Sequence, residues 1–418
     1  MEYLLPILYL LLFYFLVFKF KFFKLDELPG WVTYLVLFLK VVSGITYYLV
    51  HVWLYPIDQE IYFKAGEVIY SSVNESWWYY IRLVLGPSGS FLEPEIFKYA
   101  YHSNFWSHAG SYSLVRFHAI ARLFSFGHNL VHVVFMSWLA YLAFIFYYKV
   151  LFRLKVFRPI VLVILLAGLP SLMFWTSGIH KDGLIYFGIS VCLYFMVSMY
   201  ENGVKRSSLI WFFAGILLVS TVRDYIIILL APALFVMLFT MIFPGREFRK
   251  FLIVYVIGGV IVLLITEFNP GFNIYQTISD RQLSFIKEPG GSDFAVRRLF
   301  AHPVSIISYF PTALFNSVFR PFPWEIRNVV QMVSCVEVGL LGLLVILVFL
   351  YRKQPVKWHP VILFFIFYSL TNLLLIGLLL DNSGTLVRYR SVPLSFLTIV
   401  LVYLLDFKGL KYRNEGSD

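Results

Sequence analysis

The feature that most constrains this chain is a series of apolar runs, each long enough to cross a lipid bilayer. A transmembrane helix needs about 20 mostly apolar residues, and such runs recur from the N-terminus to about residue 405. Only 14% of the 418 residues are charged and 60% are hydrophobic, whereas roughly 25% are charged in soluble domains. The pattern predicts an all-α, polytopic transmembrane helical bundle and excludes a soluble enzyme.

We expect about eleven spans in a single integral membrane domain that covers residues 1–418. They are 3–18, 31–54, 128–148, 159–176, 184–200, 208–221, 225–244, 251–267, 329–351, 360–380 and 391–405. Short basic loops gather in the cytoplasm, and all the short basic connections fall on one side when these spans alternate. This predicts a cytoplasmic-membrane protein with its N-terminus outside and its C-terminus in the cytoplasm. The net charge of +11 then reflects topology, and no nucleic-acid partner is expected.

Two long segments then lie outside, at about residues 55–127 and 268–328. The first is rich in aromatic residues, and its stretch 113–124 has helical spacing with one polar face. Such helices lie flat in the lipid headgroup layer, so we expect amphipathic interfacial helices in the large outer loops. The second contains Glu288-Pro-Gly-Gly-Ser292, which suits a lid or an ordinary exposed loop. The ordinary loop is the favoured interpretation.

Two carboxylates, Asp58 and Glu60, closely follow the second span. Asp58 suits a helix N-cap, and Glu60 can pair with Lys64 one helical turn later. Alternatively, a carboxylate at the outer mouth of a helix bundle acts as a general base that activates a hydroxyl acceptor. Position alone favours the cap for Asp58.

Three outer turns place cations where a helix is expected to begin. They are His180-Lys181-Asp182, Arg223-Asp224 and Arg388-Tyr-Arg390. A helix N-terminus carries partial positive charge, so a cation there is unfavourable unless an anion such as phosphate binds beside it. Anionic lipid headgroups or surface water would account for each turn alone. Three such turns favour one shared anion site.

Histidine and cysteine residues give no metal-site pattern. His128 and His132 are four residues apart and suit a metal, but no third ligand is identifiable, so helix packing is favoured. Cys192 and Cys335 lie in apolar runs, where cysteine behaves as a small hydrophobe.

The turns Trp175-Thr-Ser-Gly-Ile-His-Lys-Asp182 and Gly384-Thr-Leu-Val-Arg-Tyr-Arg390, with an early acidic outer loop, give the chain a family resemblance. It resembles the C-type glycosyltransferase superfamily of polytopic membrane enzymes, near bacterial sugar transferases and repeat-unit polymerases. The resemblance covers the layout of residues 31–405. The chain differs in having an extra helix before the acidic loop and in lacking an Asp-Asp or Glu-Glu pair there.

The resemblance implies a cell-envelope glycosyltransferase that moves a sugar from a polyprenyl-phosphate lipid to a saccharide or other hydroxyl acceptor on the outer face. Asp58, with Glu60, would serve as base or metal contact. The lipid phosphate would bind at the three outer turns: His180, Lys181, Asp182, Arg223, Asp224, Arg388 and Arg390. The sequence leaves the cofactor open, and a divalent metal such as Mg²⁺ or Mn²⁺ would suit the carboxylates.

Two alternatives remain. A polysaccharide repeat-unit polymerase that uses polyprenyl-diphosphate-linked chains would need the outer arginines but not the carboxylate base. A non-enzymatic lipid or polysaccharide transporter would need broken helices or ionisable groups near the bilayer midplane. Lys40 is the only such group that we identify in the spans, which argues against ion-coupled transport.

Overall fold

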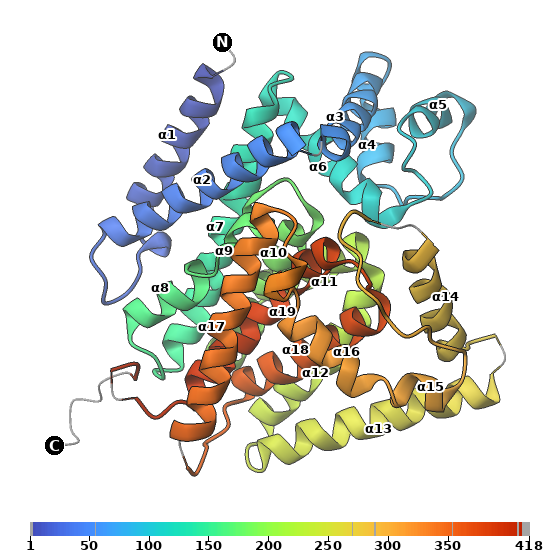
Figure 1. Ribbon diagram of the computed structural model, residues 1–418. Helices are drawn as coiled ribbons and strands as arrows, with labels where there is room; N and C mark the ends of the chain where they lie inside the picture. Colours follow the sequence, from blue (N-terminus) through green and yellow to red (C-terminus); the bar gives the residue numbers. More distant parts are fainter. Residues whose placement is uncertain are drawn as a thin grey trace. The chain divides into compact units, whose positions relative to one another are not determined.

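The computed structural model describes residues 3–54, 56–269, 271–287, 290–352, 354–407 and 409–411, except for the side chains of residues 54 and 56–59. Its elements are α-helices and short 3-10 turns (Figure 1). The α-helices are α1 (Leu4–Lys19), α2 (Trp31–Leu54), α3 (Pro56–Ser71), α4 (Trp77–Leu85), α5 (Pro94–His102), α6 (Ala109–Ser125), α7 (Asn129–Arg153), α8 (Pro159–Ala167), α9 (Pro170–Ser177), α10 (Lys181–Asn202), α11 (Arg206–Val222), α12 (Asp224–Ile242), α13 (Glu247–Phe268), α14 (Ile274–Lys287), α15 (Pro303–Ile307), α16 (Phe310–Phe319), α17 (Val329–Tyr351), α18 (Pro360–Leu379) and α19 (Ser383–Leu404).

The number of membrane spans is smaller than the sequence predicted. In the described part of the chain, eight helices are long and apolar enough to cross a membrane, or nine if the bent pair α8 and α9 forms one span. The eight are α2, α7, α10, α12, α13, α17, α18 and α19. The polytopic helical membrane architecture is confirmed, and the expected count of eleven is wrong.

The structure has fewer spans than predicted because two helices are too short to cross a membrane and one predicted span is broken at a proline. The helices α1 and α11 have 16 and 17 residues, which gives about 24–26 Å against a hydrocarbon layer of about 30 Å. The expected span 159–176 is interrupted instead of continuous, because α8 and α9 meet at a bend of 63°. Pro170 at this break lacks a backbone N–H, and its ring cannot continue the preceding helix.

Contacts divide the chain into two compact units. The first unit comprises Met1–Leu154 and Met173–Ile227, and the second comprises Lys155–Leu172 and Ile228–Asp418. In the first, α10 packs on both α7 and α11, while α2 packs on α7 and α3 on α6. In the second, α18 packs on α16 and α19, and α17 packs on α19.

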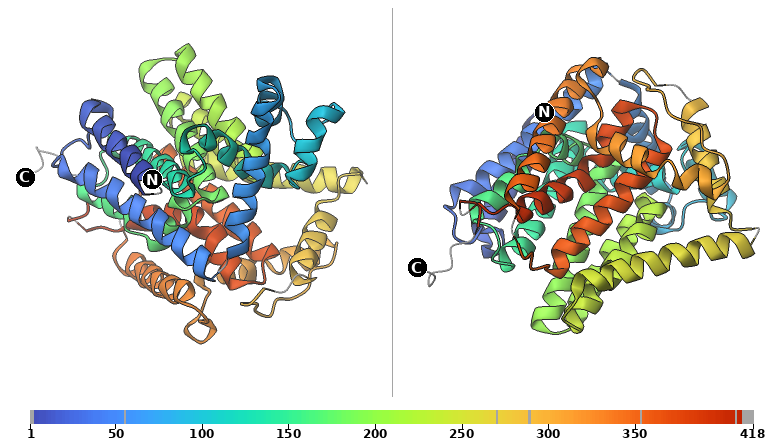
Figure 2. Two further views of the ribbon diagram at one scale, coloured as in Figure 1. Left: turned by 90° about the horizontal axis from the view of Figure 1, so that it is seen from above. Right: turned by 60° about the horizontal axis from the view of Figure 1, so that its bottom comes forward.

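The helix α13 of the second unit differs from its neighbours in exposing most of its apolar side chains. It is the long, straight yellow helix of Figures 1 and 2. Its start packs on α18 through the rings of Phe251 and Phe367, whose centroids are 5.3 Å apart. A helix that is apolar on its exposed faces is suited to contact with lipid.

The first long segment between spans folds into a compact helical layer of its own. Helices α3 to α6 share a buried core that includes Ile69, Leu83 and Val115. Tyr80 and Tyr112 cross this core and donate to backbone carbonyls of α6 and α4, at 3.1 and 3.0 Å. The helix expected at 113–124 is therefore confirmed within α6, and the segment is an ordered platform beside the spans of the first unit.

Candidate functional site

Charged side chains gather at the start of α10, in the first unit. The carboxylate of Asp182 is 2.9 Å from Nη1 of Arg223 and 2.6 Å from Nδ1 of His180. Asp182 and Arg223 are only 2% and 8% exposed. Arg223 is the C-cap of α11 and directly precedes α12, so this ion pair ties the first turn of α10 to the α11–α12 junction.

Lys181 connects the charged cluster to the helical layer that the first long segment forms. Its ammonium donates to the hydroxyl of Ser111 on α6 at 3.0 Å, and the residue is partly exposed. The preceding residue, Gly110, allows this approach, since a Cβ there would lie 2.7 Å from the Val222 carbonyl oxygen. Helices α6, α10 and α11 therefore meet within a few ångströms of Lys181.

A second lysine, Lys40, is buried and lies close to the turn that leads to His180. Lys40 on α2 is fully buried, and its ammonium donates to the Thr176 hydroxyl at 3.3 Å. Thr176 belongs to the last turn of α9, the negative end of that helix dipole, which favours a nearby cation. Gly178 follows directly and packs against the ring of Tyr47, where a Cβ would be only 2.1 Å from a ring carbon. The small residues Thr176-Ser-Gly178 thus allow close packing next to the charged turn.

The arrangement can hold an anion. Lys181 is the first residue of α10 and Arg223 is the C-cap of α11, and the positive end of the α10 dipole adds to their charge. This combination suits a phosphate or another oxyanion. Asp182 neutralises part of the positive charge, so the same cluster also has a purely structural interpretation as a buried ion pair that fixes the α11–α12 junction.

The arginines predicted near the start of the last span lie elsewhere on their helix. Helix α19 begins at Ser383, so Arg388 and Arg390 lie in its second and third turns, and the expectation that they open the helix is wrong. Arg390 is 1% exposed. It donates to the carbonyls of Ser317 at 3.1 Å and Val318 at 3.3 Å, to the carbonyl of Arg320, and to the Ser334 hydroxyl at 2.8 Å.

These contacts give Arg390 a structural role. The carbonyls of Ser317 and Val318 belong to the last turn of α16, where a helix leaves acceptors unsatisfied. The guanidinium supplies the missing donors and ties α16 to α19 and α17. Arg388 is less buried, and its guanidinium lies 4.9 Å from the ring centre of the adjacent Tyr389.

The remaining predicted site residues have local contacts. Glu60 is exposed and pairs with Lys64 at 2.7 Å, as expected for an i,i+4 pair. Asp58 is the third residue of α3, which begins at Pro56, so it is not the N-cap of that helix. The side chain of Asp58 lies outside the described part of the chain. Asp224 opens α12 and accepts from the N–H of Tyr225 at 2.8 Å.

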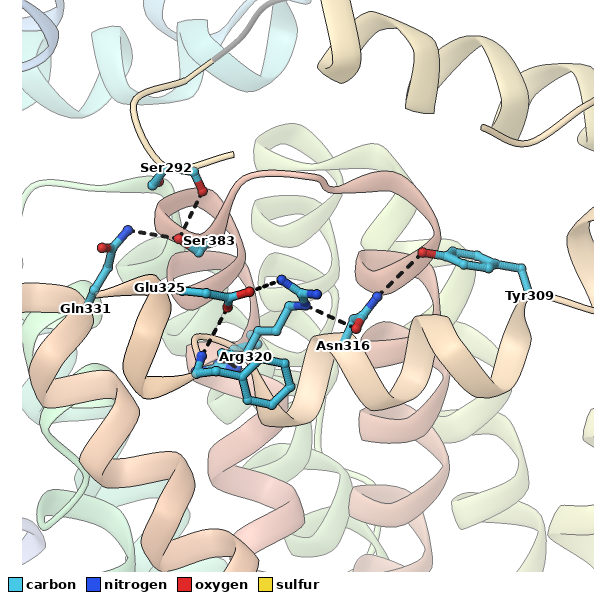
Figure 3. A network of polar contacts seen from close by, with 9 residues as sticks. Ser292, Tyr309, Asn316, Arg320, Glu325, Gln331 and Ser383 are labelled. Atoms are coloured by element: carbon cyan, nitrogen blue, oxygen red, sulfur yellow. Dashed lines mark hydrogen bonds and ion pairs between the residues drawn. The ribbon is translucent and has the colours of Figure 1, made fainter. Parts of the chain in front are cut away.

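The glycine-containing loop of the second long segment is fastened to the start of α19. Ser292 accepts from the N–H of Gly384 at 3.1 Å, and the Ser383 hydroxyl donates to the Ser292 carbonyl at 3.1 Å. Figure 3 shows Ser292 and Gln331 meeting at Ser383; the Gln331 contact is 2.8 Å. In the same view Arg320 pairs with Glu325 and reaches Asn316 at 3.1 Å. In this conformation the described part of the loop therefore attaches the second long segment to the start of α19.

The histidine pair differs from the one considered in the sequence. His132 does not pair with His128; its Nδ1 lies 2.8 Å from Nδ1 of His118 on α6, and its Nε2 contacts the Ser125 hydroxyl at 2.7 Å. Burial, with added repulsion from His132 and Arg122, holds the pKa of His118 well below its usual range. His118 is therefore neutral, and its contact with His132 packs α6 against α7.

Sequence reasoning missed a buried carboxylate within a predicted membrane span. Glu337 lies in α17, is 5% exposed and accepts from the Ser171 hydroxyl at 2.9 Å. The statement that Lys40 is the only ionisable group in the spans is therefore wrong. A single glutamate inside the run Cys335-Val-Glu-Val338 was the available signal. A transporter is expected to have broken helices or ionisable groups within its spans. The bent pair α8 and α9 and the buried Glu337 provide both features, so the sequence no longer argues against transport.

No protein-family model, curated protein or solved structure matches this chain. Among the residues that the structure describes, no group of three or more His, Cys, Asp or Glu side chains is placed to hold a metal ion. The candidate site therefore consists of the cluster around the start of α10.

Proposed function

We propose that this protein is a membrane glycosyltransferase that moves a sugar from a polyprenyl-phosphate lipid to a hydroxyl acceptor. The observation that carries the proposal is the meeting of Lys181 and Arg223 at the start of α10, beside Ser111 of α6. The resemblance of the Trp175–Asp182 turn to membrane sugar transferases supports the same assignment.

The chemistry follows from where charge develops. Transfer of the sugar leaves negative charge on the lipid phosphate, and fixed cations in a poorly hydrated site stabilise that charge most. Lys181 is the partly exposed cation of the cluster, so we assign it the phosphate contact. Arg223 and His180 hold Asp182, and through it they position the turn that carries Lys181.

The acceptor side of the reaction rests on the resemblance. Glu60 is exposed and paired with Lys64, so Asp58 is the proposed general base that takes the acceptor proton. A divalent metal such as Mg²⁺ or Mn²⁺ would be held at the same acidic segment. We further propose that the active site faces outward from the cytoplasmic membrane, with the N-terminus outside and the C-terminus in the cytoplasm.

The test is sugar transfer by purified protein in lipid vesicles, with radiolabelled undecaprenyl-phosphate hexoses as donors. Lys181→Ala should lose about 100-fold or more in rate, because removing one fixed donor from a developing oxyanion has that effect. Asp58→Asn should also abolish transfer. Lys64→Ala removes an exposed cation of the first segment and is the matched control, expected to retain activity. Full activity of both Lys181→Ala and Asp58→Asn in folded protein would refute the proposal.

A transporter is the second candidate, because of the bend between α8 and α9 and the buried Glu337. Broken helices and buried carboxylates line substrate paths in transporters. Vesicles that move a labelled polyprenyl-phosphate sugar across the bilayer, without transferring the sugar, would favour it. The repeat-unit polymerase remains the third candidate; it would tolerate Asp58→Asn but not loss of Arg388 or Arg390.

A further inference from the structure

The second unit contains a largely apolar cavity of about 430 Å³ where the break between α8 and α9 faces α17 and α19. Gly168, Leu169 and Pro170 line it from the break, and Leu394 and Thr398 line it from α19. The remaining lining residues lie on one face of α17. A helix break inside a membrane protein is tolerated where its backbone is buried or lines a cavity, so this location is consistent with a functional opening.

The cavity has one acidic side chain, Glu337, in its wall. One carboxylate oxygen, Oε1, accepts from the Ser171 hydroxyl at 2.9 Å, which places the carboxylate at the first turn of α9. The other oxygen, Oε2, is buried and has no hydrogen-bond partner among the described residues. A buried acceptor without a donor costs about 1–3 kcal/mol, so a donor from a ligand would be stabilising there.

The neighbouring polar groups do not supply this donor. Thr398 donates its hydroxyl proton to the Leu394 carbonyl at 2.9 Å. Arg390 is close enough to interact electrostatically with Glu337, but its hydrogen bonds go to three carbonyls and to the Ser334 hydroxyl. Oε2 of Glu337 therefore remains an acceptor without a donor in the described part of the chain, on a side chain that lines the apolar cavity.

The cavity is reached from the apolar surface of α17. Val336 and Leu340 line the cavity and are 61% and 64% exposed. Such side chains on a membrane-spanning helix are in contact with lipid, so a hydrocarbon chain can enter sideways from the bilayer. Glu337 is the ninth residue of α17, about 12 Å along the helix from its start.

We propose that this cavity binds one hydrocarbon chain that carries a hydroxyl group, as in long-chain or prenyl alcohols, with the hydroxyl donating to Oε2 of Glu337. A hydroxyl has one proton to donate, which matches the single free oxygen. An ammonium has three protons and would add a cation beside Arg390. At about 30 Å³ for each group of water size, the cavity volume accommodates a chain of roughly ten to fifteen carbons.

The experiment uses the full-length protein in nanodiscs and a 14-carbon alcohol with a diazirine on its chain. The matched ligand is its methyl ether, which keeps the chain but has no proton to donate. Photolabelling is mapped to peptides of α17 and α19 by mass spectrometry. We expect the alcohol to label these peptides roughly tenfold more than the ether, the effect of one charge-assisted hydrogen bond.

Protein variants separate the chain site from the hydroxyl contact. Glu337→Leu should reduce alcohol labelling to the level of the ether. Val336→Trp should block the cavity mouth and reduce labelling by both probes, whereas Leu343→Trp, on α17 but outside the cavity lining, should change neither. Equal labelling of wild-type protein by alcohol and ether would overturn the proposal, as would labelling that Val336→Trp leaves intact. The two-probe comparison needs only wild-type protein, and sugar transfer plays no part in it.

Discussion

The starts of α10 and α19 have similar sequence patterns but different structures. Helix α10 begins at Lys181 with His180 as its cap, and the cap contact to the Asp182 N–H is long, at 3.4 Å. Helix α19 begins at Ser383 with Asn382 as its cap, which accepts from the Thr385 N–H at 3.0 Å. The start of α10 therefore carries charges, and that of α19 carries neutral groups with well-placed partners.

The partners of the two buried arginines differ in the same way. Arg223 faces the carboxylate of Asp182, so its charge is matched by another charge. Arg390 faces backbone carbonyls at the end of α16, so its charge is matched by partial charges that every helix end provides. A carbonyl-bound arginine needs no ligand to account for it. The ion pair of Asp182 and Arg223 lies next to the partly exposed Lys181, so this cluster can bind an anion.

The largest expected effect is a loss of stability on replacing Arg390. Arg390→Met should lower the free energy of unfolding by about 3–5 kcal/mol, because it leaves several buried acceptors without a donor. The measurement is thermal unfolding in detergent together with the folded yield from membranes. Arg388→Met, two residues earlier and less buried, is the control and should cost much less. Equal losses for the two variants would contradict the assignment of Arg390 as the cap of α16.

The next effect tests whether Asp182 and Arg223 act as a pair. Arg223→Met and Asp182→Asn should each destabilise the protein by several kcal/mol, since each leaves a buried charge without its partner. The double variant should lose less than the sum, with a coupling energy of about 1–3 kcal/mol. Unfolding free energies of the four proteins give the coupling directly. Additive losses would show that the two side chains act separately.

Much of the architecture was predictable because apolar runs of membrane length leave few alternatives. Three predicted spans were wrong for local reasons: α1 and α11 are each about one turn too short, and Pro170 breaks the run 159–176. The start of α19 was also predicted wrongly, because Asn382, six residues before Arg388, is the N-cap of the helix. Composition alone does not show which polar residue begins a helix.

The candidate site was predictable in part. The side-by-side charges of His180, Lys181 and Asp182 indicated a helix start, and α10 does begin there. The ion pair to Arg223 and the contact with Ser111 join residues about 40 and 70 positions apart, and only tertiary packing brings them together. Glu337 was visible in the sequence, but its cavity forms from a helix break and two later helices.

The smallest effect separates the two helix starts most cleanly. Asn382→Ala should lower the free energy of unfolding by about 1 kcal/mol, the usual cost of losing an N-cap, with an additional loss from its 2.8 Å hydrogen bond to Asp293. The rate of sugar transfer should be nearly unchanged. Lys181→Ala should show the reverse, with little change in unfolding and a large loss of transfer, because Lys181 is partly exposed and its contact with Ser111 is to a neutral hydroxyl. Both variants should be measured in the same vesicle preparation, by thermal unfolding and by transfer rate. If Asn382→Ala abolishes transfer while Lys181→Ala only destabilises the fold, the two helix starts have the opposite roles to those assigned here.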